Sequence, residues 1–304
     1  TGPHDGTSTL DRVLDELQGP GKIICGAVGN DAKRKIHLMK EFTEIDTVVR
    51  SFADFYYKSS RKVTIDMWGE FNKNFEIKAV VYDADNDTML YQSESFSTAT
   101  ATAKSIYGLM KGEDGKTNVV NVKFTVTTEV NALNQKPHIM MIPKVLTLPE
   151  GNVYVGFELK SKDGGVVHAW ADGSTGGLTN KELAGWVDGD NQYTVNEIGG
   201  TGKRIISVGA YTTREHEKFK QTIGERCTFS NIGPTADGRL KPQILAPGSA
   251  IISSVSNSPQ VMSSTSAFIE AQSVQFNGDK HYYGYMDGTS MATPYVTGVI
   301  ATWL

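Results

Sequence analysis

The sequence predicts an α/β fold with a partial parallel sheet, interrupted by an inserted antiparallel β-sandwich or jelly-roll domain. Near-continuous apolar runs occur toward both ends of the chain, such as Lys-Ile-Ile-Cys-Gly-Ala-Val at 22–28 and Ile-Ile-Ser-Val-Gly-Ala-Tyr at 205–211. Such runs are typical of parallel strands covered on both faces. Between them, residues from about 40 to 170 alternate apolar and polar side chains, which is typical of an antiparallel sandwich.

This change of pattern divides the chain into three parts. Residues 1–38 are expected to form a helix and one strand of the parallel sheet, and residues 39–172 the inserted domain. Residues 173–304 are expected to complete the parallel-sheet domain. Parallel strands need long crossover connections, whereas the strands of a sandwich follow one another through short turns. The pattern therefore indicates one domain inserted into another.

The first predicted element is a helix that begins after Ser8. Ser8 is a favourable N-cap residue, with Asp11 three positions later. The apolar face of this helix is expected to consist of Leu10, Val13, Leu14 and Leu17. Gln-Gly-Pro-Gly-Lys at 18–22 ends the helix and leads into the first apolar strand.

The remaining elements follow from the same patterns. Alternating segments bounded by Gly, Asn and Asp clusters predict strands at 62–71, 75–84, 88–96, 118–130, 138–148 and 153–161. The last part of the chain has short apolar strands within 203–211 and 241–255 and glycine-rich loops before them. Residues 289–304 have helical periodicity and predict a buried helix.

Composition excludes several classes of protein. The 304 residues carry a net charge of −4 with a pI near 5.9, which argues against nucleic acid as the main partner. No apolar run reaches the roughly 18 residues that a membrane span needs. Cys25 and Cys227 are the two cysteines, which excludes a disulfide scaffold. The chain opens on Thr-Gly-Pro-His, so we expect a fragment or a processed form.

The segment Asp-Gly-Thr-Ser-Met-Ala-Thr-Pro at 287–294 places Ser290 at the start of the last helix. Pro294 falls in the first turn of that helix, where a missing N–H costs little. Free N–H groups at a helix N-terminus stabilise the oxyanion that forms when a nucleophile attacks a carbonyl. An ordinary helix cap is the alternative interpretation of this serine. An α/β-hydrolase elbow would need glycine where Ala292 stands.

The longer string decides between these interpretations. Gly-Thr-Ser-Met-Ala-Thr-Pro at 288–294 resembles the sequence around the nucleophile of subtilisin-like serine proteases (subtilases). Residues 23–31, Ile-Ile-Cys-Gly-Ala-Val-Gly-Asn-Asp, resemble the subtilase strand that ends in the oxyanion-hole asparagine, and residues 205–211, 227–248 and 250–254 resemble later family segments. Some bacterial subtilases also carry a jelly-roll insert.

The resemblance assigns roles to six residues. It implies a serine endopeptidase in which Ser290 forms the acyl-enzyme and Asn30 helps to hold the oxyanion. It also implies that the substrate is bound beside four further residues, which are Ala27, Gly29, Gly288 and Thr289. The expected partner is a peptide or protein substrate, no cofactor or metal is expected, and the expected location is secreted, cell-surface or periplasmic.

The catalytic base has no counterpart in this sequence. Subtilases carry their aspartate and histidine motifs before the oxyanion strand, and neither motif occurs here. We therefore expect a piece of a protease that is inactive alone and contacts an upstream segment of the same protein. Two alternatives stay open. One is a pseudoprotease that only binds, and the other is an insert that recognises protein, carbohydrate or calcium.

Two further motifs have plainer interpretations. His4 lies in His-Asp-Gly-Thr-Ser, which resembles the loop before the first helix rather than a catalytic histidine motif, and the other five histidines have no family context. Asp83, Asp85, Asp87 and Glu94 have the spacing of an EF-hand loop. Strand patterns flank them, so a polar hairpin turn is predicted there instead.

Overall fold

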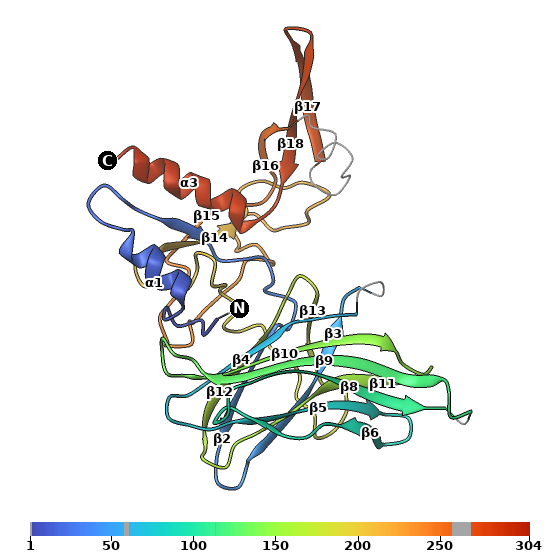
Figure 1. Cartoon of the computed structure of the whole chain (residues 1–304). Helices are drawn as coiled ribbons and strands as arrows, with labels where there is room; N and C mark the ends of the chain where they lie inside the picture. The colour runs from blue at the N-terminus through green and yellow to red at the C-terminus, as the bar shows by residue number, and fades with distance from the viewer. Residues whose placement is uncertain (1, 58–60, 113, 257–268) are drawn as a thin grey trace. The chain divides into compact units, whose positions relative to one another are not determined.

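The computed structural model describes residues 2–57, 61–112, 114–256 and 269–304 (Figure 1). Contacts divide the chain into two compact units. Unit 1 comprises Thr1–Pro3 and Arg34–Gln192, and unit 2 comprises His4–Lys33 and Tyr193–Leu304. Unit 2 is therefore assembled from two stretches of sequence that lie on either side of the larger part of unit 1.

Antiparallel sheets make up the described part of unit 1 (Figure 1). The first has the order β2-β12-β4-β10-β9-β8, formed by β2 (His37–Phe42), β12 (Gly165–Ala171), β4 (Ile65–Gly69), β10 (Pro137–Thr147), β9 (Asn118–Val130) and β8 (Thr102–Lys111). The second has the order β13-β3-β11-β5-β6, formed by β13 (Gly176–Thr179), β3 (Val48–Phe55), β11 (Val153–Lys160), β5 (Glu76–Asp83) and β6 (Thr88–Gln92). A short strand, β7 (Phe96–Ser97), pairs with β5.

The two sheets of unit 1 share one apolar core. Alternate residues of β9 are buried, as the period of a half-buried strand requires. Side chains from both sheets are fully enclosed and belong to one cluster, including Met67, Phe124 and Met141 from the first sheet and Ile77 and Phe157 from the second. One face of each sheet therefore packs against the other.

The predicted hairpin turn at 84–87 is confirmed. These residues connect β5 to β6, and the Asp83 Oδ1 atom accepts the backbone N–H groups of Asp85 and Asn86 at 3.0 and 3.2 Å. The Asp85 carboxylate accepts the backbone N–H and the side-chain amide of Asn152 at 2.9 and 2.6 Å. The carboxylates of Asp83 and Asp85 therefore stabilise the turn through hydrogen bonds. No group of three side chains that could bind a metal ion occurs in the described ranges.

A buried ion pair lies on the first sheet of unit 1. The Asp66 Oδ1 atom is 2.6 Å from His138 Nε2, and Asp66 Oδ2 accepts hydrogen bonds from Trp68 Nε1 and from the backbone N–H of Gly2. Burial alone would lower the pKa of His138, but the hydrogen bond and charge of Asp66 outweigh it and raise that pKa. His138 is therefore held as the partner of a structural carboxylate.

Unit 2 contains the predicted parallel sheet, with the order β1-β14-β15 (Figure 1). Its strands are β1 (Cys25–Ala27), β14 (Ile206–Tyr211) and β15 (Ile244–Pro247). Helix α3 (Thr289–Ala301) packs on this sheet through Ala292 and Val296, which share a cluster with Val208, Ala210 and Ala246. Among the described residues, no helix has the length and apolar character that crossing a membrane requires.

The first predicted helix is present as α1 (Thr9–Glu16), but its expected apolar face is wrong. Ser8 caps it, and the Ser8 hydroxyl accepts the backbone N–H of Asp11 at 3.1 Å. Asp11 is fully buried, whereas Leu10, Val13 and Leu17 are 42 to 58% exposed. The helix turns its acidic side inward because Asp11 accepts the Thr201 hydroxyl, and Asp15 accepts backbone N–H groups of residues 203 and 204.

An additional antiparallel sheet precedes α3. It has the order β16-β18-β17, from β16 (Ile251–Val255), β18 (Asp279–Met286) and β17 (Ile269–Phe276). Asn277 and Gly278 connect β17 to β18, with φ angles of +50° and +85°. Asn-Gly is the preferred pair for such a two-residue turn, so this dipeptide is a signal that could have predicted the hairpin. It ends four residues before Ser290.

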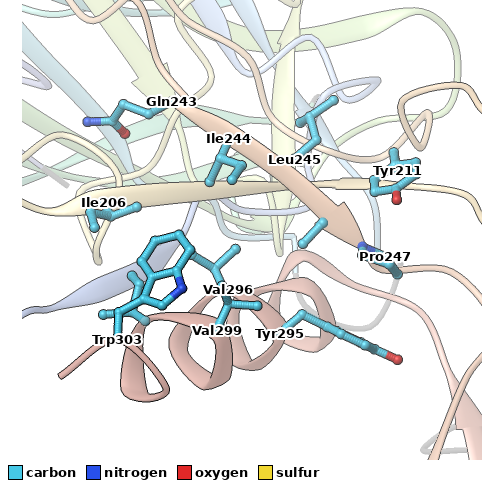
Figure 2. A pocket seen from close by; sticks show the side chains of 12 residues that line it. Ile206, Tyr211, Gln243, Ile244, Leu245, Pro247, Tyr295, Val296, Val299 and Trp303 are labelled. Carbon is cyan, nitrogen blue, oxygen red and sulfur yellow. The ribbon is translucent and has the colours of Figure 1, made fainter.

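An open apolar groove of about 600 Å³ lies between α3 and the parallel sheet (Figure 2). Helix α3 contributes Tyr295 and Val299, the residues after it contribute Trp303, and β14 and β15 contribute Ile206 and Ile244. Val299 is 50% exposed, and Trp303, which follows the helix, is 78% exposed. The expectation of a buried helix over 289–304 is therefore wrong for its C-terminal part. The apolar stripe of α3 is wider than the part that the sheet covers.

Replacing Phe157 by Ala tests the shared core of unit 1. The fully buried ring leaves a cavity between the sheets, so we expect the free energy of unfolding of unit 1 to fall by about 3–5 kcal/mol. Urea unfolding measures this change. Phe71→Ala is the matched control, since Phe71 is 52% exposed, and its effect should stay within about 0.5 kcal/mol. Equal effects of the two substitutions would contradict the assigned core.

Candidate active site around Ser290

Ser290 is the second residue of α3, and its side chain is exposed. Gly288 occupies the N-cap position with φ +150°, and its carbonyl accepts the N–H groups of Met291 and Ala292 at 3.0 and 3.3 Å. Within the described residues, the backbone N–H of Ser290 has no acceptor. An accessible hydroxyl therefore lies beside an unpaired helix N-terminal N–H group.

Asn30 is fixed against the same helix terminus. Its side-chain Oδ1 accepts the backbone N–H of Thr289 at 2.9 Å and the Thr289 hydroxyl at 3.1 Å. These two hydrogen bonds orient the Asn30 amide with its oxygen toward Thr289. The amide nitrogen, Nδ2, has no acceptor among the described residues. Asn30 is exposed, so its amide N–H groups are accessible to a bound molecule.

The two unpaired donors converge on one space beside Gly288. A Cβ atom built on Gly288 would lie 3.5 Å from Asn30 Nδ2 and 3.7 Å from the Ser290 backbone nitrogen. A side chain at position 288 would thus fill the space that both donors face, and the backbone conformation there also disfavours other residues. The arrangement can hold an oxygen atom that carries negative charge next to the Ser290 hydroxyl.

Thr289 connects the two segments that carry these donors. Its side chain is 1% exposed, and its hydroxyl accepts the backbone N–H of Gly29 at 3.2 Å while it donates to Asn30. Residues 29 and 289 are 260 positions apart in the sequence. The predicted substrate-binding residue Thr289 thus lies beneath the site, where it holds Asn30 in place.

The turn at Gly29 is held by two asparagines that the sequence interpretation did not select. Gly29 has φ +104°, and a Cβ atom there would lie 2.3 Å from Asn231 Nδ2 and 2.8 Å from Asn196 Nδ2. Asn231 is fully buried and exchanges hydrogen bonds with this turn, since its N–H donates to the Gly29 carbonyl and its Oδ1 accepts the Asp31 N–H. The Phe-Ser-Asn-Ile-Gly string at 229–233 is the sequence signal that could have identified Asn231 as one of them.

Ala27, the remaining predicted site residue, ends strand β1. It pairs in register with Val208 of β14 and is half-buried. The next residue continues this pairing, because the Val28 N–H donates to the Val208 carbonyl at 3.2 Å. The parallel sheet thereby sets the position of the backbone that leads to Gly29 and Asn30.

Asp287 fixes the other side of the nucleophile turn. Its carboxylate accepts the Ser249 hydroxyl at 3.0 Å and the Ala250 N–H at 2.6 Å, and Ala250 has a positive φ of +54°. The Gly288 N–H donates to the Gly248 carbonyl at 2.9 Å. Burial raises the pKa of Asp287. This carboxylate therefore ties the turn at 248–250 to the residues that precede Ser290.

No base for Ser290 is found among the described residues, since its hydroxyl makes no hydrogen bond there. His4 is buried, with Nδ1 at 2.7 Å from the Val195 carbonyl oxygen. His216 packs its ring on Tyr285, with the ring centroids 4.6 Å apart. His281 lies on β18, and His37, His138 and His168 belong to unit 1.

Thr289→Val tests the role of this hydroxyl. The substitution keeps the volume but leaves the Gly29 N–H without its acceptor, so we expect the free energy of unfolding of unit 2 to fall by about 1–3 kcal/mol. Hydrogen exchange at the Gly29 amide, followed by NMR, measures the local loss. Thr297→Val is the matched control on the exposed side of α3. An unchanged Gly29 exchange rate would contradict the assigned role.

Comparison with known proteins identifies the family of the chain. A model of the subtilase family matches residues 67–304, which is more than half of the chain. Over 107 residues, the chain is 39% identical to an uncharacterized protein of Aquifex aeolicus, covering 34% of this chain and 43% of that protein. Over 102 residues, it is 33% identical to the serine protease AprX of Bacillus subtilis, covering 34% of this chain and 21% of that protein.

A solved structure agrees in fold. The chain is similar to the CspB protease of Clostridium perfringens with a TM-score of 0.62 at 15% identity, covering 99% of this chain and 52% of that chain. At this identity the similarity concerns the fold alone. The chain spans about half the length, or less, of these relatives. The family match covers the segment that carries Ser290, and the chain belongs to the subtilase family.

Proposed function

We propose that this chain carries the nucleophile and the oxyanion hole of a subtilisin-like serine endopeptidase. The observation that carries the proposal is the convergence of Asn30 Nδ2 and the Ser290 N–H on the space beside Gly288. Two unpaired donors at this position fit the oxygen of a tetrahedral intermediate. Membership of the subtilase family supports the assignment and supports peptide bonds as the proposed substrate.

In the proposed reaction, the Ser290 oxygen attacks the carbonyl carbon of the scissile peptide bond and loses its proton to a base. The carbonyl oxygen becomes an oxyanion that accepts hydrogen bonds from Asn30 and from the Ser290 N–H. Collapse of this intermediate breaks the C–N bond, and the base returns the proton to the leaving amine. Water then hydrolyses the acyl-enzyme on Ser290 by the same route.

The base and its orienting carboxylate are proposed to come from outside the described residues. The support is that the Ser290 hydroxyl has no hydrogen-bond partner within them. We propose that the 304-residue chain alone hydrolyses peptides very slowly, because loss of the catalytic histidine in subtilisin costs about 10⁶ in turnover. Ala27 and Gly29 are proposed to line the substrate site on the β1 side.

A role as a binding module is the second candidate, and the same unpaired Ser290 hydroxyl favours it. Without a base, the oxyanion donors would bind a carbonyl or carboxylate group without catalysing its hydrolysis.

For both candidate functions, we propose that residues 39–172 are an inserted jelly-roll domain. Thermal-shift measurements on the whole chain with peptides, oligosaccharides and calcium test whether this domain binds a ligand.

We also propose a secreted, cell-surface or periplasmic location, as the family resemblance implies. An antibody against residues of unit 1 and fractionation of the source cells would test this. Accumulation in the cytosolic fraction would contradict it.

Labelling of Ser290 by a fluorophosphonate tests the enzymatic proposal. In a protein that joins this chain to its aspartate and histidine motifs, we expect rapid labelling that Ser290→Ala abolishes. The isolated chain should label slowly, since no base activates its hydroxyl. Rapid labelling of the isolated chain would contradict an external base, and absence of labelling in the joined protein would favour the binding module.

Asn30→Ala tests the oxyanion hole in the same joined protein. Loss of a side-chain donor of this kind costs about 10²–10³ in turnover in subtilisin. Loss of an interaction that is made only in the transition state lowers kcat and leaves KM unchanged. We therefore expect kcat to fall by that factor and KM to stay nearly constant. Asn86→Ala, in the exposed turn of unit 1, is the control. A fall confined to KM would place Asn30 in binding and not in transition-state stabilisation.

A further inference from the structure

Asn196 packs against the turn at Gly29 with a side-chain amide that is not paired. Its backbone N–H donates to the Val28 carbonyl at 3.0 Å, which holds the residue beside the end of strand β1. A Cβ atom built on Gly29 would lie 2.8 Å from Asn196 Nδ2. The other end of the amide, Oδ1, is buried and has no hydrogen-bond partner among the described residues, and Nδ2 has no acceptor there.

The neighbouring asparagines differ from Asn196 in this respect. Asn231 donates from Nδ2 to the Thr194 carbonyl at 2.7 Å, and its Oδ1 accepts the Asp31 N–H at 2.6 Å. The amide oxygen of Asn30 accepts two hydrogen bonds. Buried polar groups in folded proteins are nearly always paired, because an unmade hydrogen bond is costly. An amide with both ends unused is therefore available to a bound molecule.

The backbone on both sides of Asn196 is fixed by contacts with other segments. The Thr194 N–H donates to the Ile232 carbonyl at 2.8 Å. On the other side, the carboxylate of Glu197 is buried and accepts the His4 N–H at 2.6 Å. The amide of Asn196 is thus held at a defined place, and a preorganised group binds a ligand at a lower cost in conformational entropy.

Gly29 connects this amide to the oxyanion donors. The next residue is Asn30, and consecutive Cα atoms lie about 3.8 Å apart. In the proposed reaction, the scissile carbonyl oxygen lies at Asn30 Nδ2, and the side chain of the same substrate residue starts from the carbon bonded to that carbonyl. Gly29 has no side chain that would separate this substrate residue from Asn196. The substrate side chain next to the scissile carbonyl is therefore the one that can reach the amide.

We propose that Asn196 determines substrate specificity, and that it selects a carboxamide side chain, glutamine or asparagine, at the substrate residue that supplies the scissile carbonyl. The NH₂ group of the substrate side chain donates to Asn196 Oδ1, and Asn196 Nδ2 donates to the amide oxygen of the substrate. The inference rests on the proposed function, because it names the substrate class of the same site.

Hydrogen-bonding chemistry distinguishes a carboxamide from side chains of similar length. A carboxamide satisfies both ends of another amide at once, because it carries a donor and an acceptor side by side. Ionised glutamate has no hydrogen to donate to Oδ1, and methionine leaves both ends of the amide unpaired. Lysine donates to Oδ1 but offers no acceptor to Nδ2. A site built to form hydrogen bonds discriminates against substrates that cannot form them.

Fluorogenic peptides that differ only at this residue test the proposal, in the protein that joins this chain to its aspartate and histidine motifs. We expect kcat/KM for glutamine to exceed that for methionine and for glutamate by at least about tenfold. In Asn196→Ala, the preference for glutamine over methionine should disappear. Asn196→Asp keeps the shape of the side chain but introduces a carboxylate, so lysine should overtake glutamine.

Asn231→Ala is the matched control, because Asn231 donates its N–H to the Gly29 carbonyl and holds the same turn. Loosening of the turn should lower kcat/KM for every peptide by a similar factor and leave the order of preference unchanged. Equal kcat/KM for glutamine, glutamate and methionine in the wild type would overturn the proposal. A preference for glutamine that survives in Asn196→Ala would also overturn it.

Peptide binding to the joined protein with Ser290→Ala separates this proposal from the proposed function. Fluorescence anisotropy with labelled peptides that end in glutamine or methionine needs no catalysis. The glutamine peptide should bind about tenfold more tightly, and adding Asn196→Ala should remove the difference. Equal affinities would overturn the role of Asn196 even where peptides are hydrolysed. An intact difference in affinity without hydrolysis of any peptide would contradict the endopeptidase and leave the role of Asn196 supported.

Discussion

The hydroxyl group of Thr289 is the contact on which the candidate site depends. It accepts the N–H of Gly29 and donates to Asn30, so it joins the end of strand β1 to the start of helix α3. Both segments are short, and neither fixes the other through the chain, because 260 residues separate them. A buried hydrogen-bonding group is costly to leave unpaired, so this single side chain restricts where Asn30 and Ser290 can lie relative to each other.

Buried polar groups supplement a small apolar core in unit 2. The sheet and α3 share a modest cluster around Val208 and Ala292, while Asn231 and Asp11 are fully buried and hydrogen-bonded to neighbouring segments. Hydrogen bonds of this kind have direction, which apolar contacts lack, and they suit a region where donor atoms must converge within a few tenths of an ångström. Unit 1 contrasts with this arrangement, because alternating apolar residues fill the space between its two sheets.

Sequence patterns predicted the elements whose burial is regular. Strand β9 occupies Asn118–Val130, the range that alternation indicated, because one of its faces is covered along almost its whole length. Strand β8 was missed because it lies at a sheet edge, where most of its side chains are exposed and alternation carries little information. The apolar side of α1 was assigned to the interior, yet Asp11 lies there, since specific hydrogen bonds replaced apolar packing on that helix.

The sequence by itself determined the subtilase family, the parallel-sheet class and the identity of Ser290 and Asn30 as candidates, because short strings around a reactive group constrain its local chemistry. The tertiary structure decided how those strings meet. Thr289 lies beneath the site, Asn231 and Asn196 shape the Gly29 turn, and two unpaired donors face the space beside Gly288. These relations depend on hydrogen bonds between residues 37 to 260 positions apart, and no local sequence pattern records such a separation.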